Sequence, residues 1–124
     1  MFANTKALSG FAVDDIEAAR GFYADTLGID VSGTDLLLTL RLAGGRDTLI
    51  YLKPDFTPAT YTILNFVVDN VEETVDQLAS RGVHFERYDG FEQDEKGISR
   101  AEGGPHIAWF KDPAGNIVSV LEER

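Results

Sequence analysis

The chain contains an internal repeat. Residues 11–17, FAVDDIE, align with residues 66–72, FVVDNVE, at an offset of 55 positions. Farther along, Gly28-Ile29 aligns with Gly82-Val83 at an offset of 54, because the second copy is one residue shorter. Each copy has the same order of features, namely an apolar strand, an acidic turn, an amphipathic helix, a glycine and another strand. The repeat therefore predicts two similar modules, each with one helix.

The local pattern of each copy favours a strand followed by a helix. Residues 7–13 and 61–68 are short apolar runs rich in β-forming residues. Polar side chains after each run can accept hydrogen bonds from the free N–H groups of a helix start, and a glycine can end that helix. These residues are Asp14 or Asp15 with Gly28 in the first copy, and Asp69 or Asn70 with Gly82 in the second.

Three further strands are expected after each helix, separated by glycine- and proline-rich turns. Within residues 36–42 every even position is leucine, and we expect these leucines to lie in the core. Residues 89–105 form a long polar loop, which is typical either of a lid or binding loop or of a mobile segment. The expected strands cover residues 30–32, 36–42 and 48–53 in the first copy, and 83–88, 107–110 and 116–121 in the second.

Composition narrows the function classes. The chain has 124 residues, which fits one domain, and it has no cysteine, which excludes thiolate catalysis and thiolate zinc sites. Its net charge of −10 disfavours nucleic acid and anionic membranes as partners. No apolar run approaches the ~20 residues of a membrane span, and residues 1–10 lack the features of a signal peptide. We therefore expect a cytoplasmic protein.

The duplicated plan resembles the vicinal oxygen chelate superfamily, which includes glyoxalases, bleomycin resistance proteins and extradiol dioxygenases. The similarity lies in residues 13–23, VDDIEAARGFY, in Leu27-Gly28 and in residues 110–122, FKDPAGNIVSVLE. It implies an α+β fold in which two βαβββ modules form curved mixed sheets around a cavity. The modules would cover residues 6–54 and 61–122 of a single domain, 1–124.

The resemblance also implies a range of activities. Metal-dependent members hold a divalent cation with four ligands, usually His and Glu, and use it to isomerise hemithioacetals, open catechol rings or add thiols to an epoxide. Other members bind drugs such as bleomycin without metal or reaction. Members usually form homodimers, so the resemblance implies a homodimer here.

This sequence departs from the family at the metal. Aligned residue by residue, the four ligand positions fall on Leu8, Tyr51, Ile63 and Ser119. Leucine and isoleucine donate nothing to a cation, and neutral serine and tyrosine are weak ligands. We therefore expect no metal and no cofactor at these positions.

The two histidines do not supply a replacement. His84 and Glu86 share one face of an expected strand, but a pair falls short of the three or four protein ligands of a zinc site. His106 lies beside the long loop. Two hypotheses remain for it, namely a residue at the rim of the cavity without a special role and an acid–base group.

Strand alternation predicts that the cavity is lined mostly by apolar side chains with a few polar ones, which is the composition of a small-molecule pocket. Trp109 is a candidate platform for a flat ligand, Arg41 and Lys53 are candidates for an anionic group, and Phe91 either closes the site or is a surface aromatic. The candidate ligand-binding residues are Leu8, Arg41, Tyr51, Ile63, Asn65, Trp109 and Ser119.

The reading that the residues favour is metal-independent binding of a small organic ligand, aromatic or anionic. One alternative is a metal-independent enzyme in which Tyr51, His106 or Asn65 handles protons. A metal-dependent lactoylglutathione lyase or dioxygenase with non-standard ligands is less favoured. A further hypothesis is that the chain is a structural subunit or interaction partner whose cavity is filled and has no function.

Overall fold

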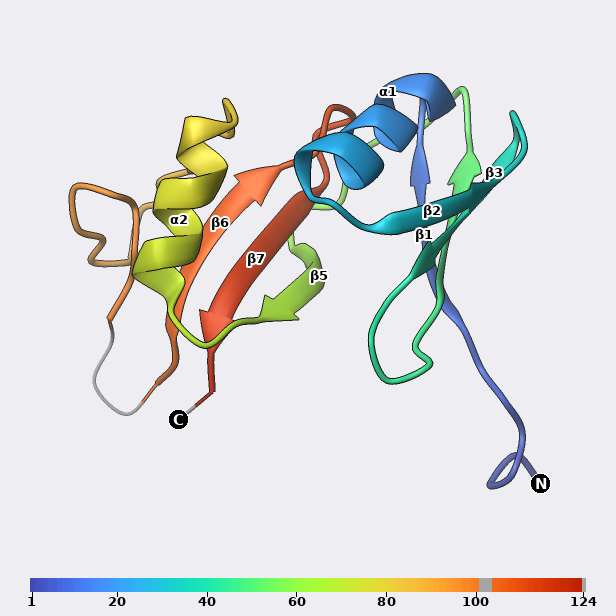
Figure 1. Ribbon diagram of the computed structural model, residues 1–124, viewed down its shortest axis with the longest axis horizontal. Coiled ribbons are helices and arrows are strands. Elements are labelled where there is room, and N and C mark those ends of the chain that lie inside the picture. The colour runs from blue at the N-terminus through green and yellow to red at the C-terminus, as the bar shows by residue number, and fades with distance from the viewer. Residues whose placement is uncertain (101–103, 124) are drawn as a thin grey trace. The chain divides into compact units, whose positions relative to one another are not determined.

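A computed structural model describes residues 1–100 and 104–123 (Figure 1). The chain divides into two compact units, Met1–Thr57 and Pro58–Arg124. Each unit holds a small mixed sheet and helix, which is the α+β architecture that the sequence predicts. Among the described residues, no helix has the length and apolar character needed to cross a membrane.

The first unit is a four-stranded sheet with the order β1-β4-β3-β2. β1 pairs in parallel with β4, whereas β3 is antiparallel to both β4 and β2. The helix α1 continues directly into a short π-helical turn, η1. The elements are β1(Ser9–Val13), α1(Ile16–Gly21), η1(Phe22–Thr26), β2(Asp30–Gly33), β3(Leu37–Arg41) and β4(Thr48–Leu52).

The second unit has a three-stranded sheet with the order β5-β7-β6. β5 pairs in parallel with β7, and β7 pairs antiparallel with β6. This pattern repeats the β1-β4-β3 part of the first unit. The elements are β5(Thr62–Val67), α2(Val71–Ser80), β6(His106–Lys111) and β7(Ile117–Glu122).

The two copies of the repeat start and stop their helices in the same way. The Asp15 carboxylate accepts a hydrogen bond from the Ala18 amide, and the Asn70 side chain accepts one from Glu73, both at 3.0 Å. The capping residues therefore lie 55 positions apart, the same offset as in the sequence. Gly28 and Gly82 follow the helices at φ of 72° and 88°, a conformation that disfavours other residues.

Each sheet buries one face against its own helix. In the first unit Ile50, Leu38 and Leu40 are fully buried, and Phe11 contacts the buried Tyr23 ring at 5.9 Å between centroids. In the second unit the Glu122 carboxylate accepts a hydrogen bond of 2.7 Å from the Val71 amide at the start of α2. Alternation therefore places the remaining residues of that face, Val118, Val120, Ala108 and Phe110, toward α2.

One expected strand is wrong, and one expected core residue of another strand is exposed. Residues 83–88 do not form a strand, because only Phe85 bridges to β6, at Phe110. The Glu86 amide also donates to the Trp109 carbonyl of β6 at 2.8 Å, and Glu86, Arg87 and Tyr88 all bond to the long loop through backbone or side-chain atoms. Leu36 lies outside β3 and is exposed, so the core leucines of this run are Leu38 and Leu40.

The turn between β6 and β7 is held by a buried carboxylate. Asp112, 4% exposed, accepts hydrogen bonds from the amides of Ala114 and Asn116 and from the Asn116 side chain, at 2.8 to 3.0 Å. Gly115 occupies the turn at φ 94°. This network fixes the pairing of β6 with β7, and therefore the register of the residues on their faces.

Replacing Asp112 should be costly for that reason. We expect Asp112→Ala to lower the free energy of unfolding by about 3 kcal/mol, because it removes the buried carboxylate that accepts hydrogen bonds from the Ala114 amide and from the Asn116 amide and side chain. The exposed Asp69→Ala is the control and should change it by less than about 0.5 kcal/mol. Urea denaturation measures both values, and equal effects of the two substitutions would contradict this role of Asp112.

Candidate functional site

The face of the second sheet that does not face α2 brings together three of the candidate residues. β5 pairs with β7 so that Asn65 lies beside Ser119, and β7 pairs with β6 so that Ser119 lies beside Trp109. Ile107 and Leu121 form the next pair along the same face. We call the surface formed by Asn65, Ser119, Trp109, Ile107 and Leu121 the candidate face.

The two polar side chains of the candidate face, Ser119 and Asn65, are hydrogen-bonded to each other. The Ser119 hydroxyl donates a hydrogen bond of 2.5 Å to the Asn65 side-chain oxygen. Ser119 is fully buried, whereas Asn65 is exposed. The Asn65 amide nitrogen has no partner among the described residues, so it remains a donor that an acceptor on a ligand can use.

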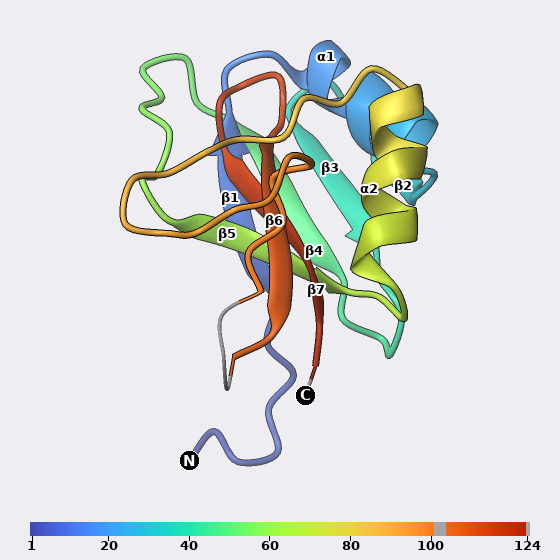
Figure 2. The ribbon, with the colours of Figure 1, turned by 90° about the vertical axis from the view of Figure 1, so that its left-hand side faces the viewer.

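Trp109 forms the apolar part of the candidate face. Its ring contacts Tyr88 edge-on at 5.6 Å between centroids and Phe91 at 5.0 Å with a tilt of 57°. Both contacting rings come from the long connection between α2 and β6, which runs along β6 (Figure 2). The loop therefore contributes to the surroundings of Trp109 as much as the sheet does.

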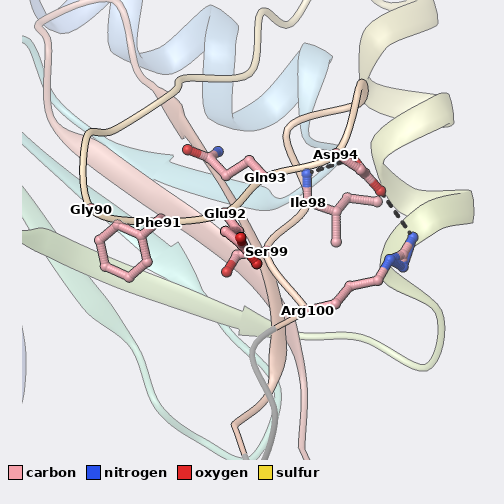
Figure 3. Close-up of a pocket in the computed structure, with 8 residues that line it drawn as sticks. All are labelled: Gly90, Phe91, Glu92, Gln93, Asp94, Ile98, Ser99 and Arg100. Carbon is pink, nitrogen blue, oxygen red and sulfur yellow. Dashed lines mark hydrogen bonds and ion pairs between the residues drawn. The ribbon is translucent and has the colours of Figure 1, made fainter.

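A pocket of about 680 Å³ lies in this connection (Figure 3). Its lining is mixed, with an aromatic ring, an aliphatic side chain, two acids and one arginine among its members. The lining residues are Gly90, Phe91, Glu92, Gln93, Asp94, Ile98, Ser99 and Arg100. Most of the predicted loop 89–105 is thus folded around a pocket, while residues 101–103 lie outside the described residues.

The loop is held in place by a glutamine and an aspartate. Gln93 accepts a hydrogen bond from the Tyr88 amide and donates two, to the carbonyls of Glu86 and Gly97. Asp94 accepts from the amides of Lys96 and Ile98, which closes a tight turn over the buried Ile98. These bonds satisfy the loop backbone internally, as regular structure would.

Two cations attach the loop to α2. Lys96 pairs with Glu72 and Asp76 at 3.0 to 3.1 Å, and Arg100 pairs with Glu72 and Asp94 at 3.1 to 3.3 Å. Hydrogen bonds to Asp76 and then Glu72 raise the pKa of Lys96 above its ordinary value. The part of the loop after residue 93 is therefore anchored at several points.

The candidates of the first unit lie on the face of its sheet opposite α1. Leu8 and Tyr51 are exposed there, together with Leu37. Arg41 pairs with Asp47 at 3.3 Å and donates to the Ser32 hydroxyl at 3.2 Å, and Lys53 pairs with Asp55 at 2.8 Å. Both candidate anion-binding cations thus already have acidic partners.

Two candidates of the second unit lie apart from the candidate face. Ile63 is the extra residue of a bulge in β5, between the Thr62 and Leu64 pairs. His106 lies opposite Glu122, on the face toward α2, with its Nδ1 atom 3.9 Å from a Glu122 oxygen. It is therefore on the other side of the sheet from Trp109.

The side chains at the aligned ligand positions do not fit a divalent cation. Leu8 and Ile63 have no donor atoms, and the Ser119 hydroxyl is committed to Asn65. Across residues 1–100 and 104–123, no group of three or more His, Asp or Glu side chains is arranged to hold a metal ion. The chemistry of the donors, which are hydrocarbon or neutral oxygen, is unsuited to such an ion.

Sequence reasoning missed Tyr88 as part of the site. The residue falls in a segment expected to be a strand, and its contact with Trp109 depends on the turn that follows it. Burial raises the pKa of the Tyr88 phenol above its ordinary value, and the nearby Glu86 charge adds to this effect. The Tyr88 hydroxyl is buried and has no hydrogen-bond partner among the described residues.

Removing that hydroxyl should not harm the protein. We expect Tyr88→Phe to leave the free energy of unfolding at pH 8 unchanged or to raise it by up to about 1 kcal/mol, because an unpartnered buried group is lost. A raised pKa means that the wild type loses stability as pH rises through the folded-state pKa, above the unfolded value of about 10. Tyr88→Phe should therefore lose less stability than the wild type between pH 8 and pH 11.

Urea denaturation at both pH values tests this expectation. The exposed Tyr61→Phe is the matched control and should behave as the wild type. A loss of more than about 1 kcal/mol in Tyr88→Phe at pH 8 would show that the hydroxyl has a bonding role.

The comparison with protein families gives one match that spans most of the chain. The model of the Glyoxalase/Bleomycin resistance protein/Dioxygenase superfamily matches residues 7–120. The uncharacterized protein YraH of Bacillus subtilis is 26% identical over 125 residues, which cover 89% of this chain and 91% of YraH.

Solved structures of similar fold include both a binding protein and an enzyme. TnmS3, an antibiotic binding protein from Streptomyces sp. CB03234, has a TM-score of 0.70 at 22% identity and covers 98% of both chains. Lactoylglutathione lyase from Agrobacterium tumefaciens has a TM-score of 0.70 at 20% identity, covering 97% of this chain and 95% of that one. Identities this low show a shared fold and leave the activity to be argued from the site.

Proposed function

Because this chain belongs to the Glyoxalase/Bleomycin resistance protein/Dioxygenase superfamily, we propose that it binds a small organic ligand on its candidate face, without a metal ion. The observation that carries the proposal is the set of side chains at Ser119 and its neighbours. The buried Ser119 hydroxyl is bonded to the exposed Asn65 amide and lies beside the Trp109 indole. A divalent metal ion would instead require carboxylates or imidazoles at this place.

The composition of the candidate face suits recognition of an uncharged or aromatic molecule. Ile107 and Leu121 offer half-buried apolar surface beside the buried Trp109 ring, which supplies affinity, and Asn65 offers an unused donor, which sets orientation. Ser119 fixes the Asn65 side chain, so the donor is positioned before a ligand arrives. TnmS3, an antibiotic binding protein, has the same fold, which supports a binding function of this general type.

The other functional readings have less support in the geometry. Arg41 and Lys53 already pair with Asp47 and Asp55, which disfavours a ligand recognised mainly as an anion. His106 lies on the α2 side of the sheet, so it is poorly placed to act as an acid or base for a molecule on the candidate face.

Binding should depend on Asn65 and not on metal. In buffer with excess EDTA, we expect members of a panel of planar aromatic compounds to raise the melting temperature of the protein. Asn65→Leu should weaken binding of such a compound about tenfold by titration calorimetry, because one hydrogen bond to the ligand is lost. Asn65 is exposed, so the variant should remain folded, with a free energy of unfolding lower by about 1–3 kcal/mol because the buried Ser119 hydroxyl loses its acceptor.

A matched control lies on α2. Gln77→Leu makes the same kind of change at an exposed amide on the opposite side of the second unit, and it should bind as the wild type does. Loss of binding in EDTA with recovery on adding zinc, nickel, manganese or iron(II) would contradict the proposal, as would equal weakening by both variants.

We also expect the chain to form a homodimer. Leu8, Leu37 and Tyr51 leave an exposed apolar patch on the first sheet, and unpaired strand edges need cover. Light scattering should give twice the 13.6 kDa chain mass at about 100 μM. A mass equal to one chain at that concentration would contradict this expectation.

A further inference from the structure

A single tight turn presents two aromatic rings to Trp109. The Phe91 amide donates to the Tyr88 carbonyl at 3.4 Å, so residues 88–91 form a four-residue turn. Gly90, at its third position, has φ 89°, which such a turn requires and which a side chain would disfavour. The turn places the two rings at its ends, and both contact the indole.

The Phe91 ring covers an indole that is otherwise part of the candidate face. Trp109 is 7% exposed, whereas Phe91 is 54% exposed. A half-exposed ring at a turn gains little from burial, so exchanging it for another flat apolar group costs little. In contrast, the Trp109 indole is stabilised whenever a flat group, either the Phe91 ring or a ligand ring, covers it and keeps water away.

Phe91 also borders the loop pocket (Figure 3). Ser99, which lines that pocket, exchanges two backbone hydrogen bonds with Ile107, at 2.8 and 3.1 Å. Residues paired in this way point to the same side of a sheet, so Ser99 belongs to the side that carries Ile107 and Trp109. The Phe91 ring therefore both lines the pocket of about 680 Å³ and contacts Trp109.

Movement of Phe91 need not unfold the loop. Gln93 and Asp94 hold the backbone after the turn, and Lys96 and Arg100 fasten it to α2. Within the turn the Phe91 amide makes one long hydrogen bond, and the Gln93 side chain holds the Tyr88 amide at the start of the turn. A rotation of the Phe91 side chain is thus available while the rest of the loop stays in place.

The charges around the turn favour a positive ligand. Asp89, Glu92 and Glu95 have no ion-pair partner among the described residues. They outnumber Arg87, the neighbouring cation that donates only to the Asp94 carbonyl, whereas Glu86 pairs with Lys111 and Asp94 with Arg100. The net charge of the chain is −10, which attracts cations over a distance. Aromatic rings add a further attraction for a cation that lies over their faces.

We propose that Tyr88 and Trp109 form a subsite for a planar aromatic cation, and that the Phe91 ring occupies the place of the ligand ring in the free protein. The inference rests on the proposed binding function and adds the ligand class and the residue that a ligand must displace. Phe91 thereby selects for ligands whose flat ring covers Trp109 better than its own does.

The experiment compares Phe91→Ala with Phe2→Ala, both at exposed phenylalanines, so both variants should fold. Trp109 is the only tryptophan, and its emission reports on this site alone. Without any ligand, Phe91→Ala should raise the acrylamide quenching constant of Trp109 at least twofold. Proflavine, a planar cation, should bind Phe91→Ala at least threefold more tightly than the wild type, and anthracene-2-carboxylate, a planar anion of similar size, should bind both more weakly than proflavine.

Each outcome has a separate meaning. An unchanged quenching constant, or proflavine binding that is equal or weaker in Phe91→Ala, overturns the displacement by Phe91. Tighter binding of the carboxylate than of proflavine overturns the ligand class. If proflavine binds the wild type and Asn65→Leu weakens it while Phe91→Ala does not change it, only this inference fails. If no compound of the aromatic panel binds any variant, the proposed function fails with it.

Discussion

Each sheet of this protein has a single helix, and that helix covers a single face. Because side chains alternate along a strand, every second residue packs against the helix and the others form a different surface. In the second unit one set consists of Val118, Val120, Ala108 and Phe110, and the other includes Ser119 and Trp109. The candidate site depends on this division, which the buried Asp112 turn maintains by fixing the register of β6 and β7.

Much of this arrangement could be predicted from the sequence, because it depends on local and periodic signals. The repeat at an offset of 55 predicted two equivalent helix starts, and the structure has Asp15 and Asn70 as their caps. Alternation placed Leu38 and Leu40 in the core, and Trp109 and Ser119 on the opposite face of their own sheet.

The remaining features depend on contacts that no local pattern specifies. Residues 83–88 have the composition of a strand, yet Gln93 and Asp94 take up hydrogen-bonding groups of this segment. Its pairing with β6 is limited to the Phe85 bridge and the bond from the Glu86 amide to the Trp109 carbonyl. The contact between Phe91 and Trp109 follows from a turn at Gly90 together with the path of the loop beside β6. For Leu36 the sequence pattern predicted too much. The leucine alternation starts at this residue, but β3 begins only at Leu37, so Leu36 lies outside the strand.

Membership in the superfamily does not decide the chemistry, because proteins of this fold include a lyase and an antibiotic binding protein. Our proposal therefore rests on the side chains of this chain. Ser119 gives its hydrogen bond to Asn65, and Leu8 and Ile63 have no atoms that a cation can use. The aromatic rings and the free amide nitrogen of Asn65 are the features on which we base the proposed binding of a flat organic molecule.

The most direct measurement is an NMR titration of ¹⁵N-labelled protein with proflavine in the presence of EDTA. The account predicts shifts of the Trp109 indole signal and of the Asn65 side-chain amide, together with residues 88–91, while α2 signals stay in place. Shifts that appear only after a divalent metal is added, or that fall on α2 and leave Trp109 and Asn65 unchanged, would contradict it.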